Sequence, residues 1–568
     1  MKVLICSVYG SGGDDSFLTL LPVGVGSLVA VLRNAGFTAK AANFIGLPST
    51  EIRKILAAEQ PDLLGISVMT HNRHDSVRLA ELAKELNPAG IVVFGGPHAT
   101  HRCREILAAC PAVDAVVLGE GEETLRELAE LLAESSPINP TPTSPLIQGE
   151  HRGVQGGHEG IAAIRGLAFR DGDTVVVTPP RPPLPGLDAL PLPSAGFEGG
   201  INIDLRHQLE FLITSRGCPA ACSFCSSPHF WGRSLRFRSP RNMVDEIRTI
   251  RDRYGLIYFS IRDDTFTTDR KRVIEFCRLL LEEHLFILWN CQSRVNAVDE
   301  EMLLWMRRAG CDCIQYGVES GSTPILSALG KRITPEQIVR ASEATRKVGI
   351  RLSIYLMTGI PGETEQELRE TLTLLETLKA DDGQVSPLAY YPGTRLFAAA
   401  VERGGVPADL FERSPEEALY VRNDPFVVSA TRRLLRKIGD LSPNNFSGKR
   451  ESVRARRLAG YCHTGNVTAG ELLADGGDFT GAEKLYREIV SLEPDNPWGW
   501  LLLGELYRET GRSAEAQAAF RRLAELIPAH LPAWEALADL YRVTGDQAEA
   551  LRGRERVKVL TNPAGSAG

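Results

Sequence analysis

The sequence predicts an α/β protein in three parts: an N-terminal doubly wound, Rossmann-like parallel sheet, a central partial (β/α)6 barrel and a C-terminal all-α solenoid. Three observations support this prediction. Apolar strands alternate with amphipathic helices over residues 1–135, the same alternation returns over 206–400, and residues 466–561 repeat every 34 residues. A chain of 568 residues is too long for one hydrophobic core, so several domains are expected.

Residues 1–135 are expected to form a sheet that helices cover on both faces. Apolar runs at 2–8, 63–68, 91–96 and 115–121 are typical of buried strands, and amphipathic helices separate them. Strands joined by helices in this way pair in parallel.

Residues 136–205 are expected to be a flexible insertion and a connector. The first part is rich in Pro, Gly, Ser and Thr and has no periodicity. A hairpin is predicted over 166–178, with its turn at Asp171 and Gly172, and a proline-rich strap follows at 179–193.

The alternation of strands and helices over 206–400 predicts six βα units. The expected strands are 211–216, 257–264, 288–295, 313–320, 351–360 and 383–392. Six such units predict an open or partial barrel, whose chemistry lies at the carboxyl ends of the strands.

The C-terminal repeat is marked by glycines at Gly477, Gly511 and Gly545. The same interval separates Pro494 from Pro528, Trp500 from Trp534, and Tyr507 from Tyr541. Helix pairs at this period are typical of tetratricopeptide repeats, and residues 401–465 before them are assigned as a helical connector. We expect the array to be separable from catalysis and to bind a protein partner; the alternative is that it caps the barrel.

Composition and charge exclude some classes of function. The net charge is −7 and the pI is about 6.0, so we expect no nucleic-acid partner. No apolar run approaches the ~20 residues that span a bilayer, so no transmembrane segment is expected. The N-terminus lacks the features of a signal peptide, and we expect a cytoplasmic protein.

One group of cysteines stands out among the eleven in the chain. Cys218, Cys222 and Cys225 have the spacing C-x3-C-x2-C, directly after the first expected barrel strand. A zinc site would need a fourth ligand, and His229 is a nearby candidate. A loop with three thiolates, bounded by glycine and proline, suits an iron–sulfur cluster better. The other cysteines are expected to be buried thiols.

The pattern C-x3-C-x-F-C, with the motifs that follow it, resembles the radical S-adenosylmethionine (SAM) superfamily over about 206–397. The resemblance implies a [4Fe–4S] cluster on the three cysteines, with one iron left open for SAM, and an electron donor such as flavodoxin or ferredoxin. The resemblance also assigns residues to each part of SAM. The adenine is assigned to Phe224, Gly359, Ile360 and Pro361, and the ribose to Glu319. The amino group is assigned to Asp263 and Asp264, and the carboxylate to Ser293 or Arg294. The alternatives are that Asp263 or Asp264 caps the helix that begins near Asp269, and that GVES and GIPG are plain turns.

Residues 1–135 resemble cobalamin-binding domains. The resemblance assigns the corrinoid to Ser67, Met69, Gly95, Gly96, Pro97, His98, Gly119, Glu120 and Gly121. Glycines at strand ends would let its nucleotide tail approach the backbone, whereas the alternative is that they form ordinary turns. Domains that ligate cobalt carry D-x-H-x-x-G after the first strand, but this chain has VYGSGGDDSF there and no histidine before His71. We therefore expect no imidazole ligand from His71, His74 or His98.

These resemblances imply a three-part enzyme that acts on a small molecule. The expected reaction is methylation of an unactivated carbon of a lipid, a tetrapyrrole or another small metabolite, in which a SAM-derived radical abstracts a hydrogen and the substrate radical takes a methyl group from cobalamin. One alternative is a cobalamin-dependent radical cyclase or rearrangement enzyme. Another is a tetratricopeptide scaffold with an inactive barrel.

Overall fold

The computed structural model describes residues 1–10, 19–134, 157–413, 416–445 and 455–561. The chain divides into two compact units, and each unit combines segments that are far apart in the sequence. The first unit comprises Met1–Leu209, Arg216–Phe237 and Leu388–Val421, and the second comprises Glu210–Ser215, Arg238–Pro387 and Arg422–Gly568.

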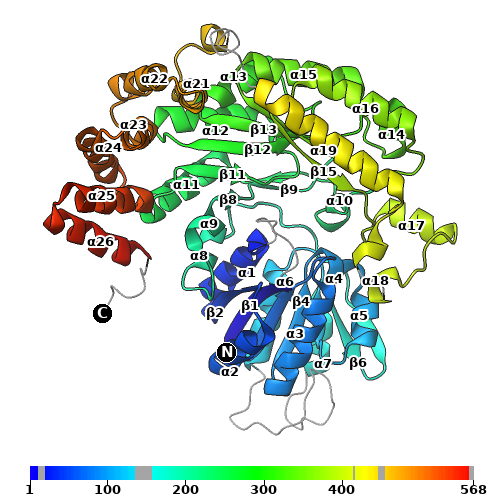
Figure 1. Ribbon diagram of the computed structural model, residues 1–568. Helices are drawn as coiled ribbons and strands as arrows, with labels where there is room; N and C mark the ends of the chain where they lie inside the picture. Colours follow the sequence, from blue (N-terminus) through cyan, green and yellow to red (C-terminus); the bar gives the residue numbers. More distant parts are fainter. Residues whose placement is uncertain (11–18, 135–156, 414–415, 446–454, 562–568) are drawn as a thin grey trace. The chain divides into compact units, whose positions relative to one another are not determined.

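The first unit contains a seven-stranded sheet with the order β2-β1-β3-β4-β5-β6-β7 (Figure 1). Its strands are β1 (Lys2–Tyr9), β2 (Thr38–Ile45), β3 (Leu63–Ser67), β4 (Ile91–Gly95), β5 (Ala115–Val117), β6 (Leu167–Asp171) and β7 (Thr174–Val177). The first five strands are parallel, as expected. Nearly every residue of β1 is buried, which is typical of a parallel strand covered on both faces.

Helices cover both faces of this sheet. They are α1 (Val23–Asn34), α2 (Ser49–Glu59), α3 (Arg73–Leu86), α4 (Pro97–His101), α5 (Cys103–Ala109) and α6 (Glu122–Glu134). Leu4 and Cys6 share a core with side chains of α2, α3 and α5. Val3 and Ile5 point to the other face and are also buried, and α1 and α6 pack together there.

The hairpin β6–β7 is part of the sheet, which differs from its expected role in a connector. Its turn lies where the sequence predicted it, with Gly172 at a φ of +57°. However, β6 pairs antiparallel with β5, with Phe169 opposite Ala115, and β7 continues the sheet beyond β6. This pairing joins residues about fifty positions apart, so no local pattern indicates it.

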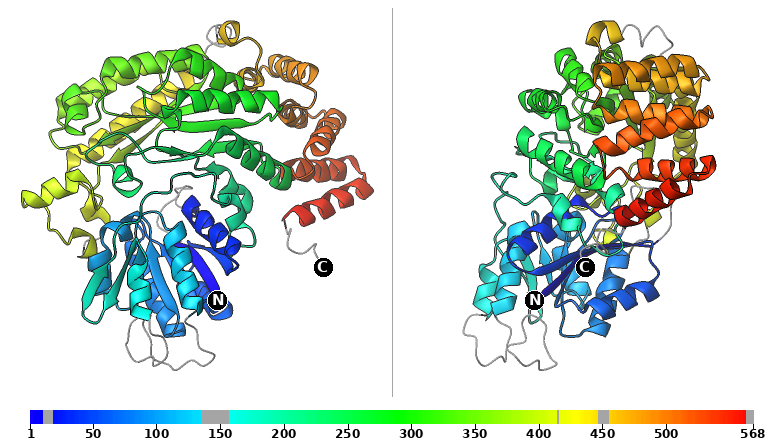
Figure 2. Two further views of the ribbon diagram at one scale, coloured as in Figure 1. Left: turned by 180° about the vertical axis from the view of Figure 1, so that it is seen from behind. Right: turned by 90° about the vertical axis from the view of Figure 1, so that its left-hand side faces the viewer.

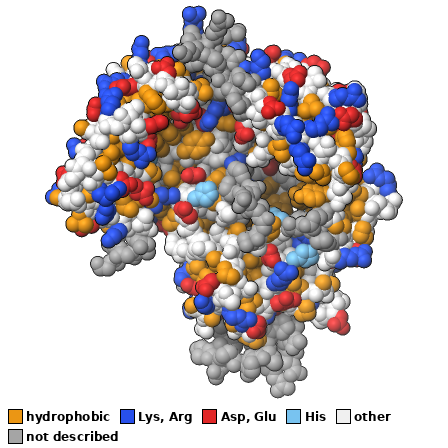
Figure 3. Space-filling model, in the orientation of Figure 1, with side chains coloured by type: hydrophobic (Ala, Val, Ile, Leu, Met, Phe, Trp, Pro, Cys, Tyr) orange, Lys and Arg blue, Asp and Glu red, His pale blue; other side chains and the backbone are white. Residues whose placement is uncertain are grey.

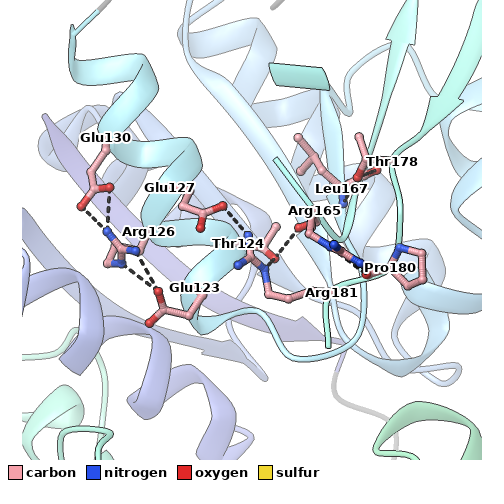
Figure 4. A network of polar contacts seen from close by, with 10 residues as sticks. All are labelled: Glu123, Thr124, Arg126, Glu127, Glu130, Arg165, Leu167, Thr178, Pro180 and Arg181. Atoms are coloured by element: carbon pink, nitrogen blue, oxygen red, sulfur yellow. Dashed lines mark hydrogen bonds and ion pairs between the residues drawn. The ribbon is translucent and has the colours of Figure 1, made fainter. Parts of the chain in front are cut away.

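The proline-rich strap after β7 is bound to α6 (Figure 4). Arg181 Nε donates to Thr124 Oγ1 over 2.8 Å, and Arg181 Nη2 forms an ion pair with Glu127. Thr124 donates to the carbonyl oxygen of Arg165 over 2.9 Å, and Arg165 Nη2 donates to the carbonyl oxygen of Pro180 over 2.9 Å. These bonds hold the strap, the hairpin and α6 together.

The first unit has shorter helices outside the sheet. They are α7 (Gly157–Ala163), α8 (Pro193–Phe197), α9 (Leu205–Leu209), α10 (Ser227–Phe230), α17 (Arg395–Glu402), α18 (Leu410–Arg413) and the 3-10 turn η3 (Glu416–Leu419). The expected insertion at 136–160 lies mostly outside the described residues. The chain crosses between the units in the short strand β9 (Ser215–Arg216), and β10 (Arg236–Phe237) pairs with β9.

The second unit contains a six-stranded, fully parallel sheet with the order β15-β14-β13-β12-β11-β8 (Figure 1). Its strands are β8 (Phe211–Leu212), β11 (Tyr258–Ile261), β12 (Leu288–Ser293), β13 (Cys311–Glu319), β14 (Arg351–Thr358) and β15 (Asp382–Pro387). This sheet is the expected partial barrel. The first expected strand, 211–216, is split between β8 and β9, and the last ends at Pro387.

Helices connect successive strands of this sheet, and a further helix, α19 (Pro425–Asn445), follows its last strand. The connecting helices are α11 (Pro240–Tyr254), η2 (Phe266–Thr268), α12 (Arg270–Glu282), α13 (Glu300–Arg308), α14 (Thr323–Ala328), α15 (Pro335–Lys347) and α16 (Glu365–Leu378). Side chains cap several of them: Asp269 accepts a hydrogen bond from the Arg272 amide at the start of α12. The aspartates expected as alternative caps, Asp263 and Asp264, do not cap this helix.

The C-terminal helices form the expected repeat and stack as successive pairs (Figure 2). They are α21 (His463–Asp475), α22 (Phe479–Leu492), α23 (Pro497–Glu509), α24 (Ser513–Leu526), α25 (Leu531–Thr544) and α26 (Gln547–Thr561). Gly477, Gly511 and Gly545 follow the first helix of each pair and have φ angles of +78°, +74° and +87°. The indole nitrogens of Trp500 and Trp534 donate to the carbonyl oxygens of Pro494 and Pro528, which repeats one contact at the predicted interval.

The helix array shares a buried core with the barrel, whereas its separability from catalysis stays a prediction. Ile257 and Leu288, at the start of barrel strands, pack with Val467, Trp498 and Ile527 of the array. A Cβ atom at Gly255 would collide with the backbone of the array, which shows how closely the two parts approach. The alternative that the array caps the barrel agrees with this packing.

Two further observations concern the charges on the surface and the length of the apolar helices. On the face shown in Figure 3, Lys and Arg side chains are interspersed with Asp and Glu side chains. Among the described residues, no helix is both long enough and apolar enough to cross a membrane.

Candidate functional site

The three cysteines lie on an irregular loop between β9 and α10, inside the first unit. Cys218 and Cys222 are buried and Cys225 is half-buried. Gly217 has a φ of +95°, and a Cβ atom there would collide with the carbonyl oxygen of Ser234. Glycine therefore lets the chain turn tightly at the entrance to the cysteine loop. All eleven cysteines are in the described residues, and none of them forms a disulfide.

The donor set of this loop fits an iron–sulfur cluster. Within the described ranges, no group of three His, Cys, Asp or Glu side chains is arranged to hold a single metal ion, so the zinc alternative with His229 has no formed site there. In a three-cysteine cluster, each thiolate binds a different iron, so the sulfur atoms do not converge on one point.

Helix α17 holds the middle of the cysteine loop. The amide of Leu396 donates to the carbonyl oxygen of Ser223 over 2.9 Å. The guanidinium of Arg395 donates to the carbonyl oxygen of Ala221. Both carbonyls lie between cysteines of the triad, so α17 fixes the path of the loop.

Ion pairs bind both ends of the cysteine loop to the first sheet. Arg216 Nη2 pairs with Glu122, and Arg216 Nη1 lies 3.4 Å from Glu120 Oε2. Arg236, at the far end of the loop, also pairs with Glu120. All four side chains are at most 9% exposed. Burial lowers the pKa of Arg216, but the charges of Glu122 and Glu120 outweigh this effect and the pKa is raised.

The residues assigned to cobalamin lie at the carboxyl ends of β3, β4 and β5, on the same unit. Ser67 pairs in register with Gly95. Gly96 has a φ of +97°, and a Cβ atom there would lie 2.9 Å from the carbonyl oxygen of Val68, so only glycine fits. The site of a Cβ at Gly119, where φ is +66°, has no atom within 4 Å. A half-buried glycine backbone at a strand end lets a corrinoid tail approach closely, so these residues fit the cofactor.

Four other assigned residues have structural roles in this unit. The amide of Met69 donates to Asn72 Oδ1 over 2.7 Å, which closes the turn after β3. Pro97 begins α4, where its missing amide hydrogen carries no penalty. A Cβ atom at Gly121 would lie 3.1 Å from Val117 Cγ1, so the backbone passes close to β5. The carboxylate of Glu120 binds arginines, so its side chain holds the cysteine loop.

His98 is buried beside Thr70 and Phe411. Its Nδ1 lies 3.2 Å from Thr70 Oγ1, and its ring meets the ring of Phe411 edge-on, with 5.8 Å between centroids. Burial, followed by the charges of Arg73 and Arg102, lowers the pKa of His98 to about 3. The absence of a cobalt-ligating imidazole stays a prediction, and residues 11–18 of the region that lacks the D-x-H-x-x-G motif lie outside the described residues.

The second unit places the residues assigned to SAM at the carboxyl ends of its strands, except Phe224, which lies on the cysteine loop of the first unit. Asp263 follows β11 and is 1% exposed. Its Oδ1 accepts hydrogen bonds from the amides of Thr214 (2.6 Å) and Ser215 (3.0 Å), and its Oδ2 accepts one from Thr214 Oγ1 (2.6 Å). Asp263 thus fixes the turn between β8 and β9, whereas the adjacent Asp264 is exposed.

Ser293 and Arg294 end β12. The hydroxyl of Ser293 is hydrogen-bonded to the hydroxyl of Thr267 and is almost fully buried. Arg294 Nη2 donates to the carbonyl oxygen of Lys331 over 2.7 Å. The guanidinium of Arg294 is therefore held beside Lys331, which also binds Glu319.

Glu319, assigned to the ribose, forms a buried ion pair with Lys331 at the end of β13. The backbone of Glu319 has a φ of +68°, which is unfavourable for a residue with a side chain and is common at functional sites. A Cβ atom at Gly317 would lie 2.7 Å from Glu319 Oε1 and 2.8 Å from Lys331 Nζ. Glycine at 317 therefore makes room for the ion pair.

The GIPG turn after β14 is organised by Glu363. Gly359 has a φ of +73°, and its amide donates to Glu363 Oε2 over 2.7 Å. The amide of Ile360 lies 3.4 Å from the same oxygen, its side chain is fully buried, and Pro361 is exposed. The turn thus presents backbone and Pro361 to its surroundings.

Sequence reasoning missed a polar network on the barrel strands. Gln315 Oε1 accepts hydrogen bonds from Arg262 Nη1 (3.0 Å) and from the hydroxyl of Tyr355 (3.1 Å). Gln292 pairs in register with Gln315 and donates to Tyr355 over 3.4 Å. These half-buried residues alternate with fully buried ones along their strands, and this alternation in LWNCQS and CDCIQYGVE was the available signal.

The chain matches three protein-family models. The B12 binding domain matches residues 15–129, the radical SAM superfamily matches residues 212–375, and a tetratricopeptide repeat model matches residues 473–552. An uncharacterized methyltransferase of Pyrococcus horikoshii is 33% identical over 360 residues, which are 62% of this chain and 72% of the relative. The anaerobic magnesium-protoporphyrin IX monomethyl ester cyclase of Rubrivivax gelatinosus is 30% identical over 406 residues, 70% of this chain and 69% of the relative.

Two solved structures resemble the fold. The radical SAM methyltransferase TsrM from Kitasatospora setae, solved with cobalamin and a [4Fe–4S] cluster, has a TM-score of 0.57 and 18% identity, and the match covers 71% of this chain and 78% of TsrM. The cobalamin-dependent radical enzyme OxsB, solved with aqua-cobalamin and SAM, has a TM-score of 0.52 and 18% identity, and covers 100% of this chain and 84% of OxsB.

Proposed function

Because this chain belongs to the radical SAM superfamily and carries a B12-binding domain, we propose that it transfers a methyl group to an unactivated carbon of a small molecule. The chain is a cobalamin-dependent radical SAM enzyme, and its cofactors are a [4Fe–4S] cluster, SAM and cobalamin. When bound, the cluster supplies the electron that cleaves SAM, and the cobalamin carries the methyl group. We propose that a one-electron reductant such as flavodoxin or ferredoxin supplies the electron that this chemistry needs.

Residues of the first unit would hold the two metal cofactors. Cys218, Cys222 and Cys225 supply the thiolates for the cluster. Gly95, Gly96 and Gly119 expose backbone to the corrinoid, where a side chain would interfere. His98 stays a neutral, buried residue of this cradle.

Residues of the second unit would orient SAM. The exposed carboxylate of Asp264 is suited to the amino group, and Arg294 is suited to the carboxylate. Glu319, held by Lys331, presents its remaining oxygen to the ribose hydroxyls. Gln292, Gln315 and Tyr355 lie on β12, β13 and β14, before the strand ends that carry the residues assigned to SAM. Their side chains are suited to hydrogen-bonding a polar group of the substrate.

The observation that best supports methyl transfer lies within the first unit. The proposed cradle at Gly96 and Gly119 follows strands of its sheet, and Glu122, at the start of α6 in the same unit, binds Arg216 of the cysteine loop. In this proposal, one unit of the chain would hold both the methyl carrier and the cluster that starts the radical reaction. A similarity of 33% to a methyltransferase points the same way.

Product analysis tests the proposal. The anaerobically reconstituted protein, loaded with cobalamin, would be incubated with extract of a deletion strain and SAM labelled in its methyl group. A methyltransferase forms both S-adenosylhomocysteine and 5′-deoxyadenosine, and one extract metabolite gains a labelled methyl group. Formation of 5′-deoxyadenosine without labelled product or S-adenosylhomocysteine would refute methyl transfer.

A radical cyclase is the second candidate, because a cyclase relative is 30% identical over most of the chain. The same experiment separates the two reactions. A cyclase consumes SAM only for the radical, so the substrate would change without gaining a label.

A further inference from the structure

We infer that the second unit has a binding site for a small organic acid with an apolar body, at the opposite strand ends from the proposed SAM residues. The site is a cavity of about 530 Å³ between the barrel and the first helices of the repeat array. This volume lies within the range of about 300–1,000 Å³ that is usual for small-molecule pockets. The inference goes beyond the proposed reaction and does not depend on it.

The cavity is bounded by residues that precede barrel strands and by the start of the array. Arg307 comes from the end of α13, and Val348 and Gly349 precede β14. Ala469 and Leu472, on α21, form part of the opposite wall. Parallel strands carry catalytic residues at their carboxyl ends, so a pocket at the amino ends is separate from the proposed catalytic site.

Arg307 provides an unpaired positive charge in this cavity. The residue is 4% exposed. Its Nη1 donates to Thr468 Oγ1 over 3.3 Å, and among the described residues no carboxylate lies within ion-pair distance of the guanidinium. The charge of Asp312 acts on Arg307, but Asp312 is itself paired with Arg351. Burial lowers the pKa of Arg307, as expected for a cation without a close anion.

Small residues keep the free edge of this guanidinium accessible. A Cβ atom at Gly349 would lie 3.6 Å from both Nε and Nη2 of Arg307, and one at Gly465 would lie 3.8 Å from Nη2. Both glycines line the cavity, so side chains that would stand beside this edge are absent. The Nε–Nη2 edge of arginine is suited to bidentate binding of a carboxylate.

The lining determines the class of ligand. A buried, unpaired charge is costly, and an anion that enters the cavity would relieve this cost. The apolar part of the wall includes Val348, Ala459, Leu472, Leu473 and Leu485, which suit a hydrocarbon body, and the polar part includes Arg456, Asn466 and Asp478. A carboxylate on an apolar chain or ring satisfies both features, whereas inorganic phosphate would leave the apolar wall unfilled.

Ligand binding to the full-length protein tests the inference. Octanoate, below its critical micelle concentration, would be titrated by calorimetry and by thermal shift, beside 1-octanol and inorganic phosphate. We expect saturable binding of octanoate with a rise in Tm, and binding of octanol and phosphate at least tenfold weaker. Equal binding of phosphate and octanoate, or no binding of octanoate, would overturn the inference.

Three variants identify the site. Arg307→Gln should weaken octanoate binding at least tenfold, since it removes the charge. Ala469→Leu fills the cavity without touching Arg307, and it should also abolish binding. Arg278→Gln is the matched control, because Arg278 lies on the neighbouring helix α12, pairs with Glu275 at the surface and does not line the cavity. Binding that is unchanged in both site variants, or lost equally in the control, would contradict the assignment.

Discussion

Arg216, two residues before Cys218, forms a buried ion pair with Glu122, the first residue of α6. The pair joins the cysteine loop to the sheet that carries the proposed cobalamin cradle. Glu120 extends the contact, because it binds Arg216 and also Arg236 at the other end of the loop. The loop is therefore held at both ends by one acidic turn.

Replacing Arg216 by Met should destabilise the protein and its cluster. The substitution leaves Glu122 without its buried partner, and breaking such a pair costs about 3–5 kcal/mol. We expect this loss in the free energy of unfolding, measured with urea, and a lower iron content after reconstitution. Arg126→Met is the control, since Arg126 lies on α6, the helix of Glu122, and forms partly exposed ion pairs with Glu123 and Glu130. Such pairs are worth about 1 kcal/mol or less. Equal effects of the two substitutions would show that the Arg216 pair has no special role.

Replacing Lys331 by Met should weaken SAM binding. Lys331 holds the carboxylate of Glu319, whose backbone is already strained at a φ of +68°. Without the lysine, we expect the dissociation constant for SAM, measured by calorimetry on reconstituted protein, to rise at least tenfold. Lys347→Met is the control, because Lys347 pairs with Glu300 at the surface. A dissociation constant that stays at the wild-type value would remove Glu319 from the proposed SAM site.

Replacing Trp498 by Ala should destabilise the barrel together with the array. Trp498 is 8% exposed and packs in the core that Ile257 and Leu288 share with the helices. Truncation of a buried aromatic residue costs about 3–5 kcal/mol. We expect one cooperative urea transition, shifted to lower urea, whereas Leu492→Ala at an exposed site should leave it unchanged. A separate early transition of the array alone would restore the view that the array is an independent domain.

His98 should make the protein less stable in mild acid. The unfolded chain binds a proton near pH 6.5, but folded His98 does so only near pH 3, so the free energy of unfolding falls as the pH falls through this window. Between pH 7 and 5 the contribution is roughly 2 kcal/mol. His98→Asn should lose this part of the pH dependence in urea unfolding, whereas the exposed control His284→Asn should keep it. If His98→Asn kept the full pH dependence, the pKa of His98 would be the same in the folded and the unfolded protein.

Features that depend on local sequence were predictable. Gly477, Gly511 and Gly545 follow helices at a fixed interval, and each has a positive φ angle. Such an angle at a helix end favours glycine locally, so the sequence repeat was enough to predict these positions. The cysteine spacing and the six strands of the barrel are also local patterns. Their prediction needed no knowledge of distant contacts.

Features that depend on distant partners were not predictable in the same way. Nothing in the sequence indicates that Asp263 accepts hydrogen bonds from Thr214 and Ser215, and its assignment to the SAM amino group stays a prediction. No pattern in the chain links Arg216 to Glu122, which is 94 residues away. The role of β6 in the first sheet was missed for the same reason, because strand pairing is decided by the packed sheet.

The cysteine triad is the basis of the proposed chemistry, and Cys222→Ala tests it most directly. The variant and a Cys103→Ala control would be reconstituted anaerobically with iron and sulfide, then assayed for iron content, for the broad cluster absorbance at about 400 nm and for 5′-deoxyadenosine formed from SAM. Cys103 lies in α5 of the same unit, outside the cysteine loop. We predict that Cys222→Ala loses the absorbance and forms no 5′-deoxyadenosine, while Cys103→Ala behaves as wild type. A Cys222→Ala protein that retains iron and cleaves SAM at the wild-type rate would contradict the assignment of the cluster to Cys218, Cys222 and Cys225.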